Sequence, residues 1–364
     1  MPQSAPSRTF IRRAKRLAGR LLLVIVPLLL VFLVCELILR ATAPPEPETG
    51  SADRGFLACD RDSALGWIFP PHASGDFEDD RSPIIIETNT WGLRGPEFDP
   101  DLARRHVVVL GDSYAFGWGV EEAEAFPRKL EGLLRERLDD PDLVVINTGI
   151  PGYGPSQQLA MLRRLLGHVT PDIVIFTFSL ANDPVDELRL ARFAPDRLAD
   201  YEPAVREADA FLSRLSRASR TVALVDGRTR WLQFFLANAG ADARELAEVS
   251  VNRLIDACDE IGMPLLMVSV PQRKQILDGG LTGRIAAGLT RELRALPETI
   301  ARRRGVPLLD LAPVLANVQS REDAYLPHDA HWTAAGHAAV ARAVAEALPA
   351  AWTDRAADGG PATR

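Results

Sequence analysis

VVVLGDSYAFGWG, residues 107–119, is the stretch of this sequence that decides the fold. Its apolar run Val107–Leu110 is typical of a buried strand. Gly111, Asp112 and Ser113 follow at once, and a helical pattern of apolar residues comes soon after. A serine on such a sharp turn is raised above the sheet, and its backbone N–H faces the space of a reacting oxygen. Because Gly-Asp-Ser is also ordinary turn chemistry, this stretch alone leaves open whether Ser113 is catalytic.

Strand-like and helix-like segments alternate from this stretch to the C-terminus. The expected strands are 106–110, 143–147, 173–178, 265–270 and 306–309, and the expected helices are 125–137, 156–166, 243–261, 284–304 and 333–348. This alternation predicts an α/β fold, with a parallel sheet covered by helices on both faces. Residues 56–104 contain short strand-like runs and are expected to form a β-rich extension.

Residues 184–242 contain no strand pattern, and we expect a helical insertion there. Its apolar side chains either cap a substrate groove or only pack the insertion on the sheet; they are Trp231, Phe234, Phe235 and Leu236.

Three later segments follow strand ends and carry chemistry. They are TGIPGYGPSQQL at 148–159, LANDP at 180–184 and HDAHWTAAGH at 328–337. A serine, a glycine, an asparagine and a late Asp-x-His block in this order resemble the SGNH/GDSL hydrolase family, over about residues 105–348. The chain is similar in particular to membrane-anchored bacterial members, which often carry an N-x-x-G-x-R-G stretch, here NTWGLRG at 89–95. The resemblance implies a three-layer, flavodoxin-like parallel sheet in a domain spanning 105–350.

The resemblance also assigns roles to the site residues. Ser113 would be the nucleophile, His331 the general base and Asp329 its partner, since a serine hydroxyl needs a base to take its proton. The oxyanion hole would consist of the Ser113 N–H, the Gly152 N–H and the Asn182 side chain. Thr333 is the expected N-cap of the last helix, which places His331 on the loop before it.

Other interpretations of these blocks remain. Many members of the family place the aspartate three residues before the histidine, where this chain has His328, so Asp310 is an alternative acid. The Gly152 loop and the Asn182 segment are each also compatible with ordinary turns. The spacing of His328, Asp329, His331 and His337 suggests a metal site, but His337 falls inside the expected helix and no zinc motif supports it. We therefore expect no metal and no cofactor.

The N-terminal 40 residues predict a membrane anchor. Residues 1–20 contain six basic and no acidic residues, and are expected to be a cytoplasmic tail. The apolar residues 21–39 would extend about 28 Å as a helix, close to the thickness of a bilayer core. An uncleaved signal anchor at 21–40, followed by a Pro- and Glu-rich linker at 41–55, is favoured over a cleaved signal peptide. The catalytic domain would then lie on the periplasmic side of the inner membrane.

Charge and cysteine content limit the remaining features. Beyond residue 20, 36 basic residues stand against 49 acidic ones, a net charge of −13, which argues against a nucleic-acid partner. Cys59 and Cys258 would be able to pair outside the cytoplasm, but the helical pattern around Cys258 favours a buried free thiol. Residues 351–364 are expected to form a disordered tail, and the oligomeric state stays open.

The sequence thus predicts a membrane-anchored extracytoplasmic serine esterase. Its substrates would be O-acyl esters on envelope glycans or lipids. One alternative is an O-acyltransferase that acts on envelope or exported polysaccharide, with a sugar hydroxyl replacing water. A further alternative is a catalytically inactive module that binds glycans or supports their assembly.

Overall fold

A computed structural model describes most of the chain. It covers residues 26–27, 30–37, 60–62, 65–78, 83–101, 105–192, 240–277, 284, 287–288, 290–319, 321–327, 329–349 and 352. The chain divides into two compact units, residues 1–50 with 202–233 and residues 51–201 with 234–364.

In the first unit, the described residues of the predicted anchor are helical. Seven of their apolar side chains are 41–60% exposed, namely Val26, Leu30, Val31, Phe32, Leu33, Val34 and Leu37. A search of the described residues found no helix that combines the length and hydropathy needed to cross a membrane. Of the 21–39 segment, the structure describes residues 26–27 and 30–37.

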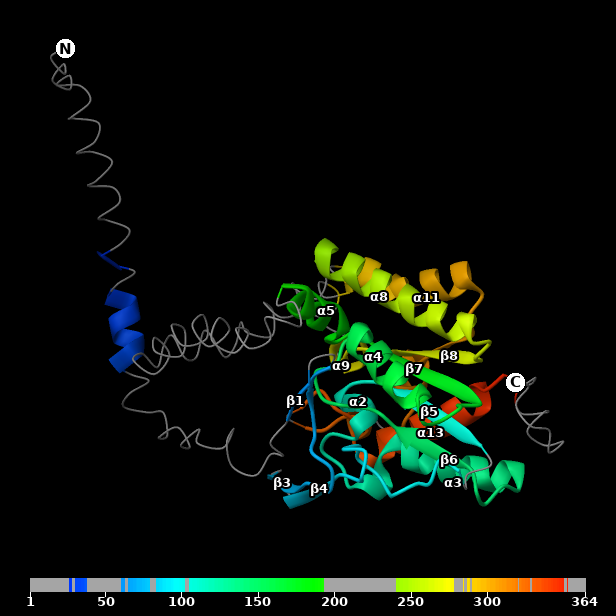
Figure 1. The fold of residues 1–364 in the computed structure, drawn as a ribbon. Helices are drawn as coiled ribbons and strands as arrows, with labels where there is room; N and C mark the ends of the chain where they lie inside the picture. Colours follow the sequence, from blue (N-terminus) through cyan, green and yellow to red (C-terminus); the bar gives the residue numbers. More distant parts are fainter. Residues whose placement is uncertain are drawn as a thin grey trace, which may run out of the picture. The chain divides into compact units, whose positions relative to one another are not determined.

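The second unit is built on a parallel five-stranded sheet with the order β6-β5-β7-β8-β9 (Figure 1). The strands are β5 (His106–Leu110), β6 (Val144–Asn147), β7 (Ile173–Ser179), β8 (Leu265–Val270) and β9 (Leu308–Asp310). The α/β prediction is therefore confirmed, although β9 starts two residues later and ends one residue later than predicted. The order is that of flavodoxin-like sheets, in which ligands bind beyond the carboxyl ends of the strands.

Helices cover both faces of this sheet because neighbouring strand residues point to opposite sides. Val108 and Leu110 share one core with three helices, which are α4 (Pro155–Leu166), α8 (Ala241–Glu260) and α11 (Arg291–Arg304). Val107 and Val109 share the other with α3 (Phe126–Leu138), α12 (Leu311–Ala316) and α13 (Ala334–Ala347). The two groups lie on opposite sides of the sheet in Figure 1.

One predicted helix, 284–304, is partly wrong. Residue Thr290 has φ −102° and ψ 12°, which departs from helical geometry, and α11 starts only at the next residue. The described residues before it, 284 and 287–288, are helical.

The described residues from 60 to 93 form a β-rich extension that packs on the core of the sheet. Two antiparallel pairs form it, β1 (Asp60–Asp62) with β2 (Gly66–Ile68) and β3 (Ser74–Glu78) with β4 (Pro83–Glu87). Its side chains Phe69, Ile86 and Leu93 are at most 3% exposed and belong to the same core cluster as α4 and α8. Burial of such side chains stabilises the contact by about 1.5–3 kcal/mol each.

The predicted helical insertion begins with α5 (Asp183–Arg192). Residues 193–239 of the expected insertion lie outside the described part of the chain. They include Trp231, Phe234, Phe235 and Leu236. Cys258 is a buried free thiol, as expected, and burial raises its pKa to about 12, whereas Cys59 lies outside the described part. Within the expected C-terminal tail, Trp352 is described and is buried in the core at 4% exposure.

Candidate active site

Residues 111–120, which we call the nucleophile turn after the role that the resemblance implies for Ser113, follow the end of β5. They begin with a one-turn helix, α2 (Ser113–Phe116). Asp112 caps this helix by accepting a hydrogen bond from the Tyr114 N–H at 2.9 Å. Gly111 allows β5 to approach β7 closely, since a Cβ there would lie 2.2 Å from the Thr177 hydroxyl. The turn therefore holds Ser113 at the carboxyl edge of the sheet, where the side chain is only 9% exposed.

A chain of two hydrogen bonds joins Ser113 to His331 and Asp329. The Nε2 of His331 lies 2.7 Å from the Ser113 hydroxyl, and the Nδ1 lies 2.5 Å from Asp329 Oδ1. The same carboxylate oxygen accepts a hydrogen bond from the His331 backbone N–H at 3.1 Å. The structure thus brings together the three residues that the sequence suggested, in the order Ser113, His331 and Asp329, which is the arrangement of a serine, a base and an acid.

Aromatic side chains from the nucleophile turn hold the imidazole in place. The Tyr114 hydroxyl donates a hydrogen bond to the Ala330 carbonyl at 3.0 Å, and its ring lies 4.9 Å from that of His331. The Trp118 ring lies 5.8 Å from the same imidazole. Behind the loop, Thr333 caps α13 as predicted, accepting from the Gly336 N–H at 3.2 Å. The histidine therefore sits between a fixed helix start and the nucleophile turn.

The electrostatics favour a charged Asp329. Burial alone would raise its pKa, but the His331 side chain and the backbone N–H groups of Ala330 and His331 lower the pKa to about 2. The carboxylate is therefore ionised at neutral pH and able to stabilise an imidazolium. Asp310, the alternative acid, instead caps α12 and accepts from the Ala312 N–H at 2.9 Å.

The loop of Gly152 packs directly on the nucleophile turn. The Ile150 N–H donates to the Gly111 carbonyl at 3.4 Å, and a Cβ on Gly149 would lie 2.4 Å from the Phe116 nitrogen. Gly152 itself has φ +82°, a conformation that favours glycine. Ser113 is the first residue of α2, so its N–H has no partner within the helix. The backbone N–H groups of Ser113 and Gly152 thus belong to two segments that are in contact.

Asn182 is held by two hydrogen bonds at the start of α5. Its Oδ1 accepts from the Ser179 hydroxyl at 2.7 Å, and its Nδ2 donates to Asp186 Oδ2 at 2.8 Å. These partners fix which end of the amide is nitrogen. Burial raises the pKa of the neighbouring Asp112, while Tyr114, His331 and Asn182 oppose that rise.

His337 is a core residue. It lies on α13, is fully buried and accepts a hydrogen bond at Nδ1 from the Phe126 N–H at 3.2 Å. Burial lowers its pKa to about 3. His328 lies outside the described residues, and no cluster of three metal-ligating side chains occurs among those that are described.

Sequence reasoning missed the residues that support the site. Tyr114 and Trp118 belong to the serine block, but their contacts to the His331 loop have no signal in the sequence, whereas the contact of Asp186 does. Its position, four residues after Asn182 and one helical turn away on α5, was a usable signal. Arg94 in the NTWGLRG stretch was noted as part of a motif without a role.

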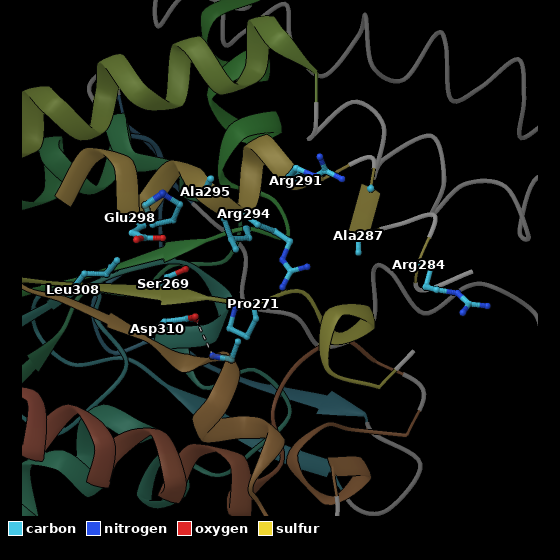
Figure 2. Close-up of a pocket in the computed structure, with 14 residues that line it drawn as sticks. Ser269, Pro271, Arg284, Ala287, Arg291, Arg294, Ala295, Glu298, Leu308 and Asp310 are labelled. Atoms are coloured by element: carbon cyan, nitrogen blue, oxygen red, sulfur yellow. Dashed lines mark hydrogen bonds between the residues drawn. The ribbon is translucent and has the colours of Figure 1, made fainter. Parts of the chain in front are cut away.

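A cavity of about 740 Å³ lies between β8, β9 and the α11 region (Figure 2). It is lined by residues at or after the carboxyl ends of β7, β8 and β9, including Leu180, Pro271 and Ala312, and by arginines such as Arg294. In Figure 2, Arg294 extends from α11 toward Pro271. The lining does not include Ser113 or His331, so the cavity lies beside the triad and not around it.

Comparisons with known proteins place the chain. The profile of the GDSL-like Lipase/Acylhydrolase family matches residues 109–339. Among solved structures, LAE5, an alpha/beta hydrolase enzyme from the metagenome of Lake Arreo, shares 15% identity, with a TM-score of 0.43 and coverage of 69% of this chain and 96% of that one.

Two further solved structures are similar. A member of the lipolytic protein G-D-S-L family from Veillonella parvula shares 11% identity, with a TM-score of 0.41 and coverage of 67% and 98%. The lipase/acylhydrolase from Enterococcus faecalis shares 14% identity, with a TM-score of 0.39 and coverage of 71% and 100%. A search of curated proteins found no match.

Proposed function

Since the chain belongs to the GDSL-like lipase/acylhydrolase family, we propose that it is a serine esterase that hydrolyses O-acyl esters through Ser113, His331 and Asp329. The observation that carries this proposal is the hydrogen-bonded chain from the Ser113 hydroxyl through His331 to Asp329, with distances of 2.7 and 2.5 Å. An imidazole placed this way takes the serine proton, while the carboxylate orients the ring.

The proposed reaction has two steps. The Ser113 oxygen attacks the ester carbonyl, His331 takes its proton and then protonates the leaving alcohol, and an acyl-enzyme forms. The oxyanion rests on the Ser113 N–H, the Gly152 N–H and the side-chain amide of Asn182, each worth about 10²–10³ in rate. Water, activated by His331, then releases the acid and regenerates the serine.

Location is a second part of the proposal. The apolar 21–39 segment, with its basic flank and the exposed apolar side chains of residues 30–37, supports a single membrane anchor. The catalytic domain would then face the periplasm, and its substrates would be acylated glycans or lipids of the envelope. The test is whether the full chain stays with membranes after a high-pH carbonate wash. Release into the supernatant would overturn the anchor and leave the chemistry standing.

The chemistry is tested with the full chain in detergent. We expect hydrolysis of p-nitrophenyl acetate and stoichiometric labelling by a fluorophosphonate, with the label mapped to Ser113. Ser113→Ala should abolish both. Ser156→Ala is the matched control, because this serine lies on α4 with its hydroxyl bonded to Glu187, and it should keep both.

Two results would redirect the proposal. Full activity in Ser113→Ala would refute the mechanism. A labelled serine that transfers its acyl group to an added glycan much faster than to water would identify an acyltransferase.

A further inference from the structure

We infer that the β-rich extension is part of the catalytic unit, with Arg94 as the residue that positions the nucleophile turn. This inference rests on the proposed esterase function and deepens it. It concerns the NTWGLRG stretch, which the triad does not include.

Arg94 is buried and makes an unusual set of bonds. Its side chain is 2% exposed and donates to three backbone carbonyls, those of Phe116 at 3.2 Å, Gly117 at 2.6 Å and Val120 at 2.7 Å. The guanidinium also lies 5.1 Å from the centre of the Phe116 ring. Burial lowers the pKa of Arg94 to about 10, although Glu122 and Glu121 oppose this effect. A buried cation is costly, so this one needs a compensating role.

The three carbonyls belong to the segment that directly follows the nucleophile. α2 is only one turn long, and the carbonyls at its C-terminal end have no partner within the helix. Arg94 satisfies them and places a positive charge where the helix dipole is negative. The same segment returns to the nucleophile, because the Trp118 N–H donates to the Ser113 carbonyl at 3.1 Å. It also carries the Trp118 ring that faces His331.

The sequence stretch is shaped to deliver this arginine. The Asn89 carboxamide accepts from the N–H groups of Trp91 and Leu93, at 2.9 and 3.1 Å, and so closes the loop. Gly92 has φ +71°, and a Cβ there would lie 2.2 Å from the Phe69 carbonyl oxygen, so only glycine allows this close approach. Asn89 and Gly92 therefore shape the loop that delivers Arg94.

The extension also contacts the loop of Gly152, which supplies the second backbone N–H of the proposed oxyanion hole. The Gln157 side chain donates to the Leu65 carbonyl at 2.6 Å, and the Tyr153 hydroxyl donates to the Trp67 carbonyl. A Cβ on Gly152 would lie 3.3 Å from the Trp67 ring. The extension thus contacts both loops that supply backbone donors, and a shift of either would weaken oxyanion stabilisation more than substrate binding.

The experiment compares three variants in the full chain. Arg94→Met removes all three donations, and Arg94→Lys keeps a cation but loses the fork that reaches separated carbonyls. Arg105→Met is the matched control. Arg105 is also an arginine with a 12% exposed side chain, but it pairs with Asp140 at 2.7 Å at the opposite end of β5.

We expect Arg94→Lys to lower kcat by about tenfold or more with KM changed by less than about threefold, since a donor is displaced and not removed. The rate of fluorophosphonate labelling should fall in parallel, at a temperature where circular dichroism shows each variant folded. Arg94→Met should lose more activity, and if it does not fold, the lysine variant still decides. Arg105→Met should keep kcat within about twofold.

A wild-type kcat in folded Arg94→Lys would overturn the inference, as would a rise in KM with kcat unchanged. An equal loss of kcat in Arg105→Met would also overturn it, because the effect would then be one of general stability. If the wild-type protein shows neither hydrolysis nor labelling, the proposed function itself fails and this inference fails with it.

Discussion

His337 should make the stability of this protein depend on pH below neutrality. Its pKa is lowered to about 3 by burial, compared with about 6.5 in an unfolded chain. Between these two pKa values the unfolded chain binds a proton at this histidine and the folded chain does not. The contribution of His337 to the free energy of unfolding is therefore intact above about pH 6.5 and is lost as the pH falls toward about 3. At pH 5 the pH lies about 1.5 units below the pKa of the unfolded histidine. At 1.36 kcal/mol per unit, protonation of the unfolded chain lowers the free energy of unfolding by about 2 kcal/mol.

His337→Asn tests this reasoning, because an asparagine oxygen replaces Nδ1 as acceptor for the Phe126 N–H and does not titrate near this pH. Urea unfolding at pH 7 and pH 5, followed by tryptophan fluorescence, gives the loss of stability between the two. We expect the variant to lose about 2 kcal/mol less than the wild type over this range. His168→Asn is the control, since His168 is exposed and its replacement should leave the loss unchanged. An identical loss in His337→Asn and wild type would refute the argument.

Two further predictions concern the triad and the oxyanion hole. Asp329→Asn removes the ionised partner of His331, and we expect kcat for p-nitrophenyl acetate to fall by about 10²–10⁴ with a small change in KM; wild-type kcat would show that the imidazole needs no acid. Asp186→Asn replaces the carboxylate that accepts from Asn182, and we expect kcat to fall by about tenfold because the amide is free to turn. Steady-state kinetics check it, with Asp256→Asn, on exposed α8 surface, as the control; an equal loss in both variants would argue against a specific role.

The sheet and the contact between Ser113, His331 and Asp329 were predictable because their signals are local. An apolar run followed by Gly111, Asp112 and Ser113 defines a strand end and a turn without knowledge of the rest of the chain. The parallel direction of the strands then follows from the alternation of strands and helices. His331 was recognisable because it stands beside Asp329 and before a capped helix, so its neighbours alone indicate its role.

The support of the site was not predictable in the same way. Arg94 bonds to carbonyls of residues 116–120, and backbone carbonyls leave no trace in the side-chain sequence. Tyr114 reaches the Ala330 carbonyl more than two hundred residues later, again through the backbone. The interruption at Thr290 was missed because apolar periodicity continues across it. Contacts to the main chain at long range are thus the part that needs coordinates.

The distance along the chain between nucleophile and base has a consequence for biogenesis. Ser113 follows β5, the first strand of the five-stranded sheet along the chain, and His331 is 218 residues further on, beyond β9. On the proposed mechanism, a nascent or truncated chain therefore carries an unactivated serine, and ester cleavage begins only when synthesis and assembly of the sheet are complete. Fluorophosphonate labelling of this single hydroxyl would then serve as a clock for the final folding event.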